Sequence, residues 1–137
     1  ITSRCLGKPM TIAERERAHV RLTEMPLIFH FSKINLNITS KSIRTGLPLR
    51  IFDILGCGGF CLTNYQSELA DYFTIGQDLE CYTDANDLSE KVTYYLSHEE
   101  ERAEIARNGF ETVQKYHNYP ERLLQMLTLA YNIKEDK

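Results

Sequence analysis

The chain has 137 residues, of which 42% are hydrophobic and 26% are charged. This balance predicts one folded domain over 1–137 and argues against disorder. The formal net charge of −3 argues against binding to nucleic acid or to anionic membrane surfaces, since both require a basic surface. No apolar run approaches the roughly 20 residues of a membrane span, so we expect a soluble, cytoplasmic protein.

Helices and short strands alternate along the sequence. The first helix begins with the capping-box pattern Thr11-Ile12-Ala13-Glu14 and runs to about Thr23. A short helical or irregular link over 26–31 leads to a strand over 34–38, where apolar and polar residues alternate. In chain order, the remaining elements are a polar loop (39–46), a buried helix that starts near Pro48 and stops at Gly58-Gly59, a strand (60–63), a helix (66–73), a strand (79–82), a helix (87–96), a helix (97–117) and a C-terminal helix within 118–137.

This order predicts an α/β fold in which helices flank a parallel sheet. Ligands of such sheets bind outside the carboxyl ends of the strands. Three segments therefore become candidates for a site, namely 39–46, 64–67 and 83–87.

The loop over 39–46 is the best candidate for an anion site. Free N–H groups at the start of the following helix attract phosphate, and hydroxyl and guanidinium groups add directed donors. The alternative is a solvated loop with a capping threonine. The groups available in the loop are the hydroxyls of Thr39, Ser40, Ser42 and Thr45, the cations Lys41 and Arg44, and the backbone of Gly46.

Asp53 is the one acid in a helix that we expect to be covered on most sides, and a buried carboxylate needs a partner. It either pairs with Arg50, three residues earlier, or accepts hydrogen bonds from two vicinal sugar hydroxyls. Asn64, at the end of the second strand, either caps the next helix or contacts a donor sugar or phosphate.

The four cysteines lack the spacing of a metal site. Cys57, Cys61 and Cys81 lie in apolar segments, so we expect reduced thiols in the core, with a disulfide or a metal site as the lesser alternatives. The glycosylation sequon at Asn37 sits at the end of an expected buried strand, which favours a structural role.

Two runs resemble the group 1 glycosyltransferases, and in particular the spore-maturation-protein branch. These runs are Ser32–Thr39, which reads SKINLNIT, and Ile43–Gln66, which contains IRTGLPLRIFDILGCGGF and LTNYQ. The resemblance implies the GT-B architecture, with two Rossmann-like domains across a cleft, and makes this chain the domain that holds a UDP- or GDP-type nucleotide-sugar. The acceptor domain, N-terminal in such proteins, would then lie outside this chain, as would the catalytic base.

The resemblance also implies roles for individual residues. Asp53 matches a glutamate that holds the ribose, and Thr45-Gly46-Leu47 matches the loop whose amides meet the diphosphate. Thr45 replaces a second glutamate that touches the donor sugar, which is a departure from the pattern. Relatives also place a strand before Glu24, so the sheet could lack one. The nucleotide-sugar site implied in this way comprises Ser42, Arg44, Thr45, Gly46, Leu47, Asp53 and Asn64.

These observations lead to two functional hypotheses. The first is a glycosyltransferase donor domain that binds a nucleotide-sugar without a tightly held cofactor or metal and that is inactive by itself. The second is a non-catalytic Rossmann-like module for interaction or regulation, which the loss of the glutamate at Thr45 slightly favours.

Overall fold

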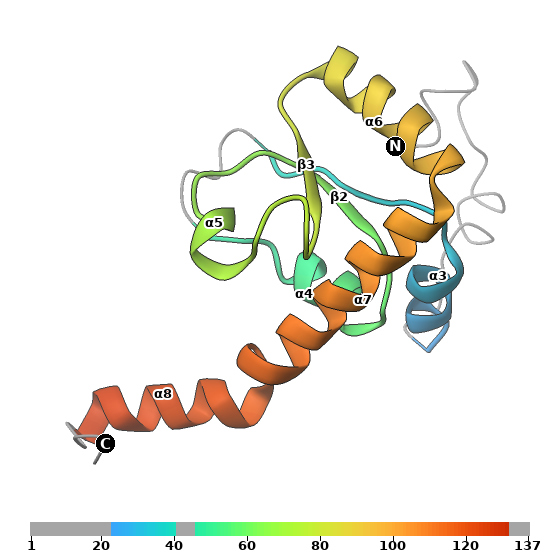
Figure 1. Ribbon diagram of the computed structural model, residues 1–137. Helices are drawn as coiled ribbons and strands as arrows, with labels where there is room; N and C mark the ends of the chain where they lie inside the picture. Colours follow the sequence, from blue (N-terminus) through green and yellow to red (C-terminus); the bar gives the residue numbers. More distant parts are fainter. Residues whose placement is uncertain (1–22, 41–45, 132–137) are drawn as a thin grey trace, which may run out of the picture.

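The computed structural model describes residues 23–40 and 46–131, which form an α/β Rossmann-like fold with helices on both faces of a parallel sheet (Figure 1). The expected fold class is therefore confirmed. The first expected helix and the loop residues 41–45 lie outside the described residues. In chain order the elements are α3 (Met25–Phe31), β1 (Asn35–Asn37), α4 (Leu49–Gly56), β2 (Cys61–Asn64), α5 (Leu69–Tyr72), β3 (Glu80–Tyr82), α6 (Ala85–Ser97), α7 (Glu99–Tyr116) and α8 (Tyr119–Tyr131).

The three strands lie in the order β1-β2-β3 and are all parallel. In β2, Leu62 pairs with Leu36 and Glu80, and Thr63 pairs with Asn37 and Cys81. All three carboxyl ends therefore meet at one edge of the sheet, where ligands of such folds bind.

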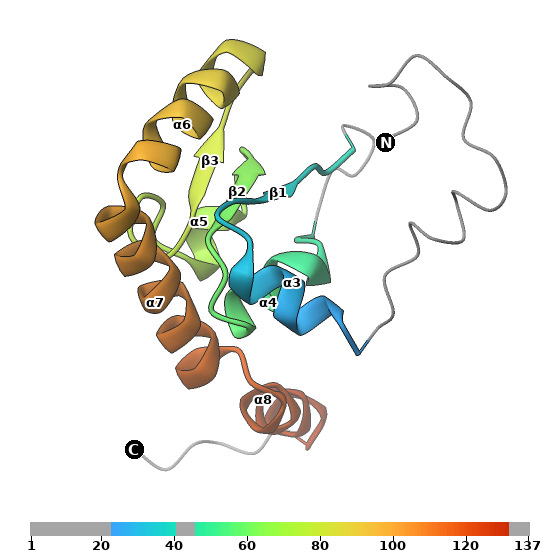
Figure 2. The ribbon, with the colours of Figure 1, turned by 90° about the vertical axis from the view of Figure 1, so that its right-hand side faces the viewer.

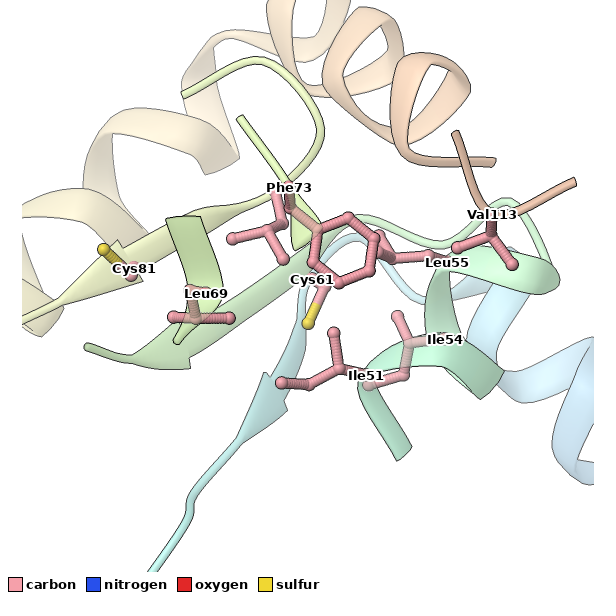
Figure 3. Close-up of a cluster of buried hydrophobic side chains, with 9 residues drawn as sticks. Ile51, Ile54, Leu55, Cys61, Leu69, Phe73, Cys81 and Val113 are labelled. Carbon is pink, nitrogen blue, oxygen red and sulfur yellow. The ribbon is translucent and has the colours of Figure 1, made fainter. Parts of the chain in front are cut away.

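The first core cluster lies between α4 and the sheet (Figure 3). Ile51, Ile54 and Leu55 are at most 1% exposed and pack toward Cys61 of β2. Their spacing places them on one face of the helix, and burial of each side chain contributes roughly 1.5–3 kcal/mol. Other members of this cluster are Leu69, Phe73, Leu79, Cys81 and Val113.

The second cluster lies on the opposite face of the sheet. Figure 2 shows α6 and α7 on the side of the sheet away from α3 and α4. Because successive strand residues point to opposite faces, Leu62 and Tyr82 lie here while Cys61 and Cys81 face α4. Tyr95 packs on Phe60, with ring centroids 4.7 Å apart. Ile105 and Ala106 of α7 complete the cluster.

A glycine lets α7 approach the rest of the domain closely. A Cβ at Gly109 would lie 2.2 Å from the carbonyl oxygen of Asp78 and 2.8 Å from Cδ2 of Leu55. Any side chain there would collide with the backbone that leads into β3. The helix therefore reaches both α4 and the sheet at this point.

The structure corrects the expected positions of several elements. The helix expected over 66–73 contains only Leu69–Tyr72, and the helix expected from Asp87 begins at Ala85. Its cap is Asp84, whose carboxylate accepts the N–H groups of Asn86 and Asp87 at 2.8 and 3.1 Å. Asp84 satisfies two N–H groups at once, which explains why the helix starts one residue after it.

The last helix, α8, extends away from the sheet (Figure 1). None of its residues is buried. Several large apolar side chains are more than half exposed, namely Leu123, Leu124, Met126 and Leu129. Within the described ranges, no helix combines the length and the apolar character that crossing a membrane requires.

Candidate nucleotide-sugar site

Buried polar side chains line the carboxyl ends of β1 and β2. Asn37 is 2% exposed and Thr63 is fully buried. The Nδ2 of Asn37 donates to Oγ1 of Thr63 at 3.0 Å and approaches Oγ1 of Thr39 at 3.4 Å. These groups form a hydrogen-bonded network rather than an apolar packing surface, and Asn37 of the sequon is buried within it.

This network contradicts the simplest interpretation of the strand pattern, in which the apolar residues are buried and the polar residues are exposed. In the alternating segment, Leu36 and Ile38 are 44% and 56% exposed, whereas the asparagines on either side of Leu36 are buried. The register explains the result, because Asn37 pairs with Thr63 on the face that α4 covers. On the other face, α6 packs against β3, the strand at the opposite side of the sheet.

Asn64 does not cap a helix. The residue at the N-cap of α5 is Glu68, which makes no side-chain capping bond. Instead, Oδ1 of Asn64 accepts the backbone N–H of Thr39 at 2.7 Å. Since an N–H can only donate, this bond fixes the orientation of the amide, and Nδ2 of Asn64 has no hydrogen-bond partner among residues 23–40 and 46–131.

Gly46 is the first described residue of the segment that leads into α4. Its φ of +88° suits glycine alone, and its N–H donates to Oε2 of Glu68. The next residue, Leu47, packs against the first core cluster. Ser42, Arg44 and Thr45, three further residues of the expected site, lie outside the described part of the chain.

The start of α4 has no side-chain cap, because its N-cap is Pro48. The N–H groups of Leu49 and Arg50 belong to the first turn, where no intrahelical acceptor exists. The carbonyl of Pro48 accepts the N–H of Ile51 at 3.1 Å. Uncapped donors and the helix dipole together make this end of α4 favourable for an anion.

Asp53 lies one turn after Leu49 on the outer side of α4. The expectation that it is buried is wrong, because its side of the helix is exposed. Within the described ranges it also forms no ion pair with Arg50. Asp53 lines a pocket of about 610 Å³ between α4, the end of α7 and the start of α8.

His117 forms the inner wall of this pocket. Its Nε2 donates to the carbonyl of Tyr72 at 3.1 Å, and its Nδ1 accepts from Arg122 at 2.8 Å. Because Arg122 can only donate, Nδ1 carries no proton. The ring also contacts Phe52 and Phe73, and burial lowers the pKa of His117. The residue therefore packs where α7 ends rather than facing the carboxyl edge of the sheet.

The expected site residues thus fall into two groups. Gly46 and Asn64 lie near the ends of β1 and β2, where Glu68 and Thr39 hold them. Asp53 opens onto the pocket beside α7 and α8, and no residue of the strand ends lines that pocket. Sequence reasoning missed Glu68, because its partner Gly46 lies 22 positions away along the chain and no local pattern links the two.

Known protein families were compared with the chain. The family described as glycosyl transferase-like matches residues 3–128. The chain belongs to this glycosyl transferase-like family. No curated protein and no solved structure matched it.

Family membership confirms the expected class of protein, a glycosyltransferase domain. It also gives the polar edge of the sheet a chemical context, since the description of the family points to glycosyl transfer. In the described part of the chain, no cluster of three or more His, Cys, Asp or Glu side chains is placed to hold a metal ion. The groups at this edge are amides, hydroxyls, the N-terminus of α4 and the carboxylate of Glu68.

Proposed function

We propose that this chain is the donor-binding domain of a group 1 glycosyltransferase of the spore-maturation type, with GT-B architecture. It binds a UDP- or GDP-sugar at the carboxyl edge of its sheet. The observation that carries the proposal is the side chain of Asn64, which Thr39 orients and whose Nδ2 donor has no hydrogen-bond partner among the residues that the structure describes. A domain of this family with such a donor at the end of β2, and with a start of α4 that lacks a side-chain cap, suits a diphosphate ligand.

Each site residue has a distinct role in this proposal. The backbone of Gly46 and Leu47 donates to the diphosphate, together with Ser42, Arg44 and Thr45. Asn64 donates to a phosphate or to the sugar. Asp53 accepts two hydrogen bonds from the ribose, because the pocket of about 610 Å³ that Asp53 lines also includes Leu49 at the start of α4, next to the proposed diphosphate position.

The transfer step depends on stabilising the departing diphosphate. The bond between the anomeric carbon and the diphosphate oxygen breaks, and the electron pair stays on that oxygen. The acceptor hydroxyl forms the new bond and gives up its proton to a base. Preorganised N–H groups stabilise the charge that develops on the diphosphate, which is the largest contribution that this domain makes.

A second domain completes the enzyme in this proposal. It carries the acceptor site and the base, so the present chain binds donor without turnover. The exposed apolar residues of α8, among them Leu123 and Met126, provide a surface that such a domain could cover. The free thiols of Cys57, Cys61 and Cys81 fit the reducing cytoplasm, which we propose as the location.

Calorimetry with UDP and GDP tests the proposal. We expect one of the two to bind the purified chain with a Kd below about 1 mM, and we expect Asp53→Asn to weaken that binding about tenfold. Glu111→Gln serves as the control, because Glu111 is an exposed acid on α7 outside the proposed site. If neither nucleotide binds, or if both variants behave alike, the chain is better described as a Rossmann-like interaction module.

A further inference from the structure

Glu68 accepts a hydrogen bond from the Gly46 amide, which is one of the donors that we propose for the diphosphate. Its Oε2 accepts the N–H of Gly46, two residues before the N-cap of α4. Glu68 itself comes from the turn between β2 and α5, next to the segment that contains Asn64. A side-chain carboxylate therefore lies at the proposed diphosphate position.

The chemistry of this contact imitates that of the ligand. A carboxylate oxygen that accepts the N–H of Gly46, two residues before the N-cap of α4, makes a charge-assisted hydrogen bond of the kind that a phosphate oxygen would make there. A diphosphate that arrives must displace the carboxylate from Gly46 and also meets its negative charge. Both effects weaken nucleotide binding. The stronger the hydrogen bond between Glu68 and Gly46, the weaker we expect the nucleotide to bind.

We propose that Glu68 is a resident competitor for the donor site, an inference that rests on the proposed function. It occupies the Gly46 amide in the empty protein, moves away when a nucleotide-sugar binds, and returns as the nucleoside diphosphate leaves. The carboxylate in this way limits the affinity for the product diphosphate and keeps the positive-φ turn at Gly46 formed between cycles.

The test compares Glu68→Gln with Asp71→Asn. Each variant removes one negative charge near α5, but Asp71 lies within the helix and exposed, and its carboxylate does not contact Gly46. UDP and GDP affinities are measured by calorimetry for the wild type and for both variants. We expect Glu68→Gln to tighten nucleotide binding about tenfold and Asp71→Asn to change it less than about threefold.

A second measurement follows the Gly46 amide directly by nuclear magnetic resonance. We expect its proton resonance to move upfield in Glu68→Gln, and to stay unchanged in Asp71→Asn. On adding nucleotide to the wild type, the same resonance should shift as phosphate replaces carboxylate. If Glu68→Gln leaves the amide proton shift of Gly46 unchanged, the contact is absent in solution and the inference is overturned.

The outcomes separate this inference from the proposed function. If the wild type binds nucleotide and Glu68→Gln binds equally well, Glu68 does not compete, although the donor site stands. If both variants bind nucleotide equally more tightly than the wild type, the overall charge near α5 controls the affinity, and the inference is again overturned. If no variant binds UDP or GDP, the proposed function itself fails, and the inference fails with it.

Discussion

Oδ1 of Asn64 accepts the backbone N–H of Thr39 at 2.7 Å, and this hydrogen bond joins the carboxyl ends of β1 and β2. Asn64→Ala removes the acceptor and should lower the free energy of unfolding by about 1 kcal/mol. Asn64→Asp keeps an acceptor for Thr39 but places a negative charge near the proposed diphosphate. We expect it to retain more stability than the alanine variant in urea unfolding, and to bind nucleotide more weakly than the wild type in calorimetry. Equal nucleotide affinity in wild type and Asn64→Asp would place the ligand elsewhere.

Thr63 accepts a hydrogen bond from Asn37 inside the sheet, where neither side chain reaches water. Thr63→Val keeps the volume but removes this acceptor, so we expect a loss of about 1–3 kcal/mol in urea unfolding. The control is Thr93→Val, because Thr93 is exposed on α6 and its hydroxyl donates to the carbonyl of Ser89 within the same helix. The double variant Asn37→Leu with Thr63→Val should lose less than the sum of the two single losses. Strict additivity would mean that the two side chains do not interact.

Two glycines at the contact between α4 and α7 should respond oppositely to alanine. Gly109→Ala puts a Cβ 2.2 Å from a backbone oxygen, which must force α7 away from the sheet. We expect a loss of about 3 kcal/mol. Gly56→Ala meets only Cγ1 of Val113 at 3.8 Å, so it should be neutral or stabilise by up to about 1 kcal/mol through helix propensity. Thermal unfolding of both variants measures the contrast, and similar melting temperatures would show that α7 packs differently.

The neutral ring of His117 should make stability depend on pH. Burial lowers its pKa below the unfolded value, with Arg122 acting in the same direction, while the carbonyl of Tyr72 and the charge of Asp78 oppose the shift. The unfolded chain thus binds the proton more readily than the folded one. The stability that His117 contributes is complete above about pH 6.5 and is lost as the pH falls through the lowered pKa.

The variant His117→Gln tests this pH dependence, because glutamine donates and accepts hydrogen bonds but does not titrate. Melting temperatures are compared from pH 8 to pH 5. The wild type should lose more stability than the variant over this range, since protonation of Nδ1 breaks the bond from Arg122. Parallel curves for the two proteins would assign the pH dependence to other groups.

Much of the fold follows from local patterns in the sequence. The apolar face of α4, the short apolar strand β2 and the helices α7 and α8 were all predictable, because hydrophobic periodicity and turn residues act over a few positions. The placement of Cys61 and Cys81 in the core follows from the same patterns. Family resemblance added the class of chemistry, which a comparison with known families confirmed.

The contacts that define the candidate site depended on tertiary structure. Glu68 reaches Gly46 across 22 positions, and Asn64 reaches Thr39 across 25. Asn37 is buried while Leu36 is exposed, because the parallel register places Asn37 on the face beneath α4. The sequence alone determined most of the segments that become strands and helices, but not where α5 and α6 begin. Only the packed structure decided which side chains meet, because strand register and helix crossing bring distant residues together.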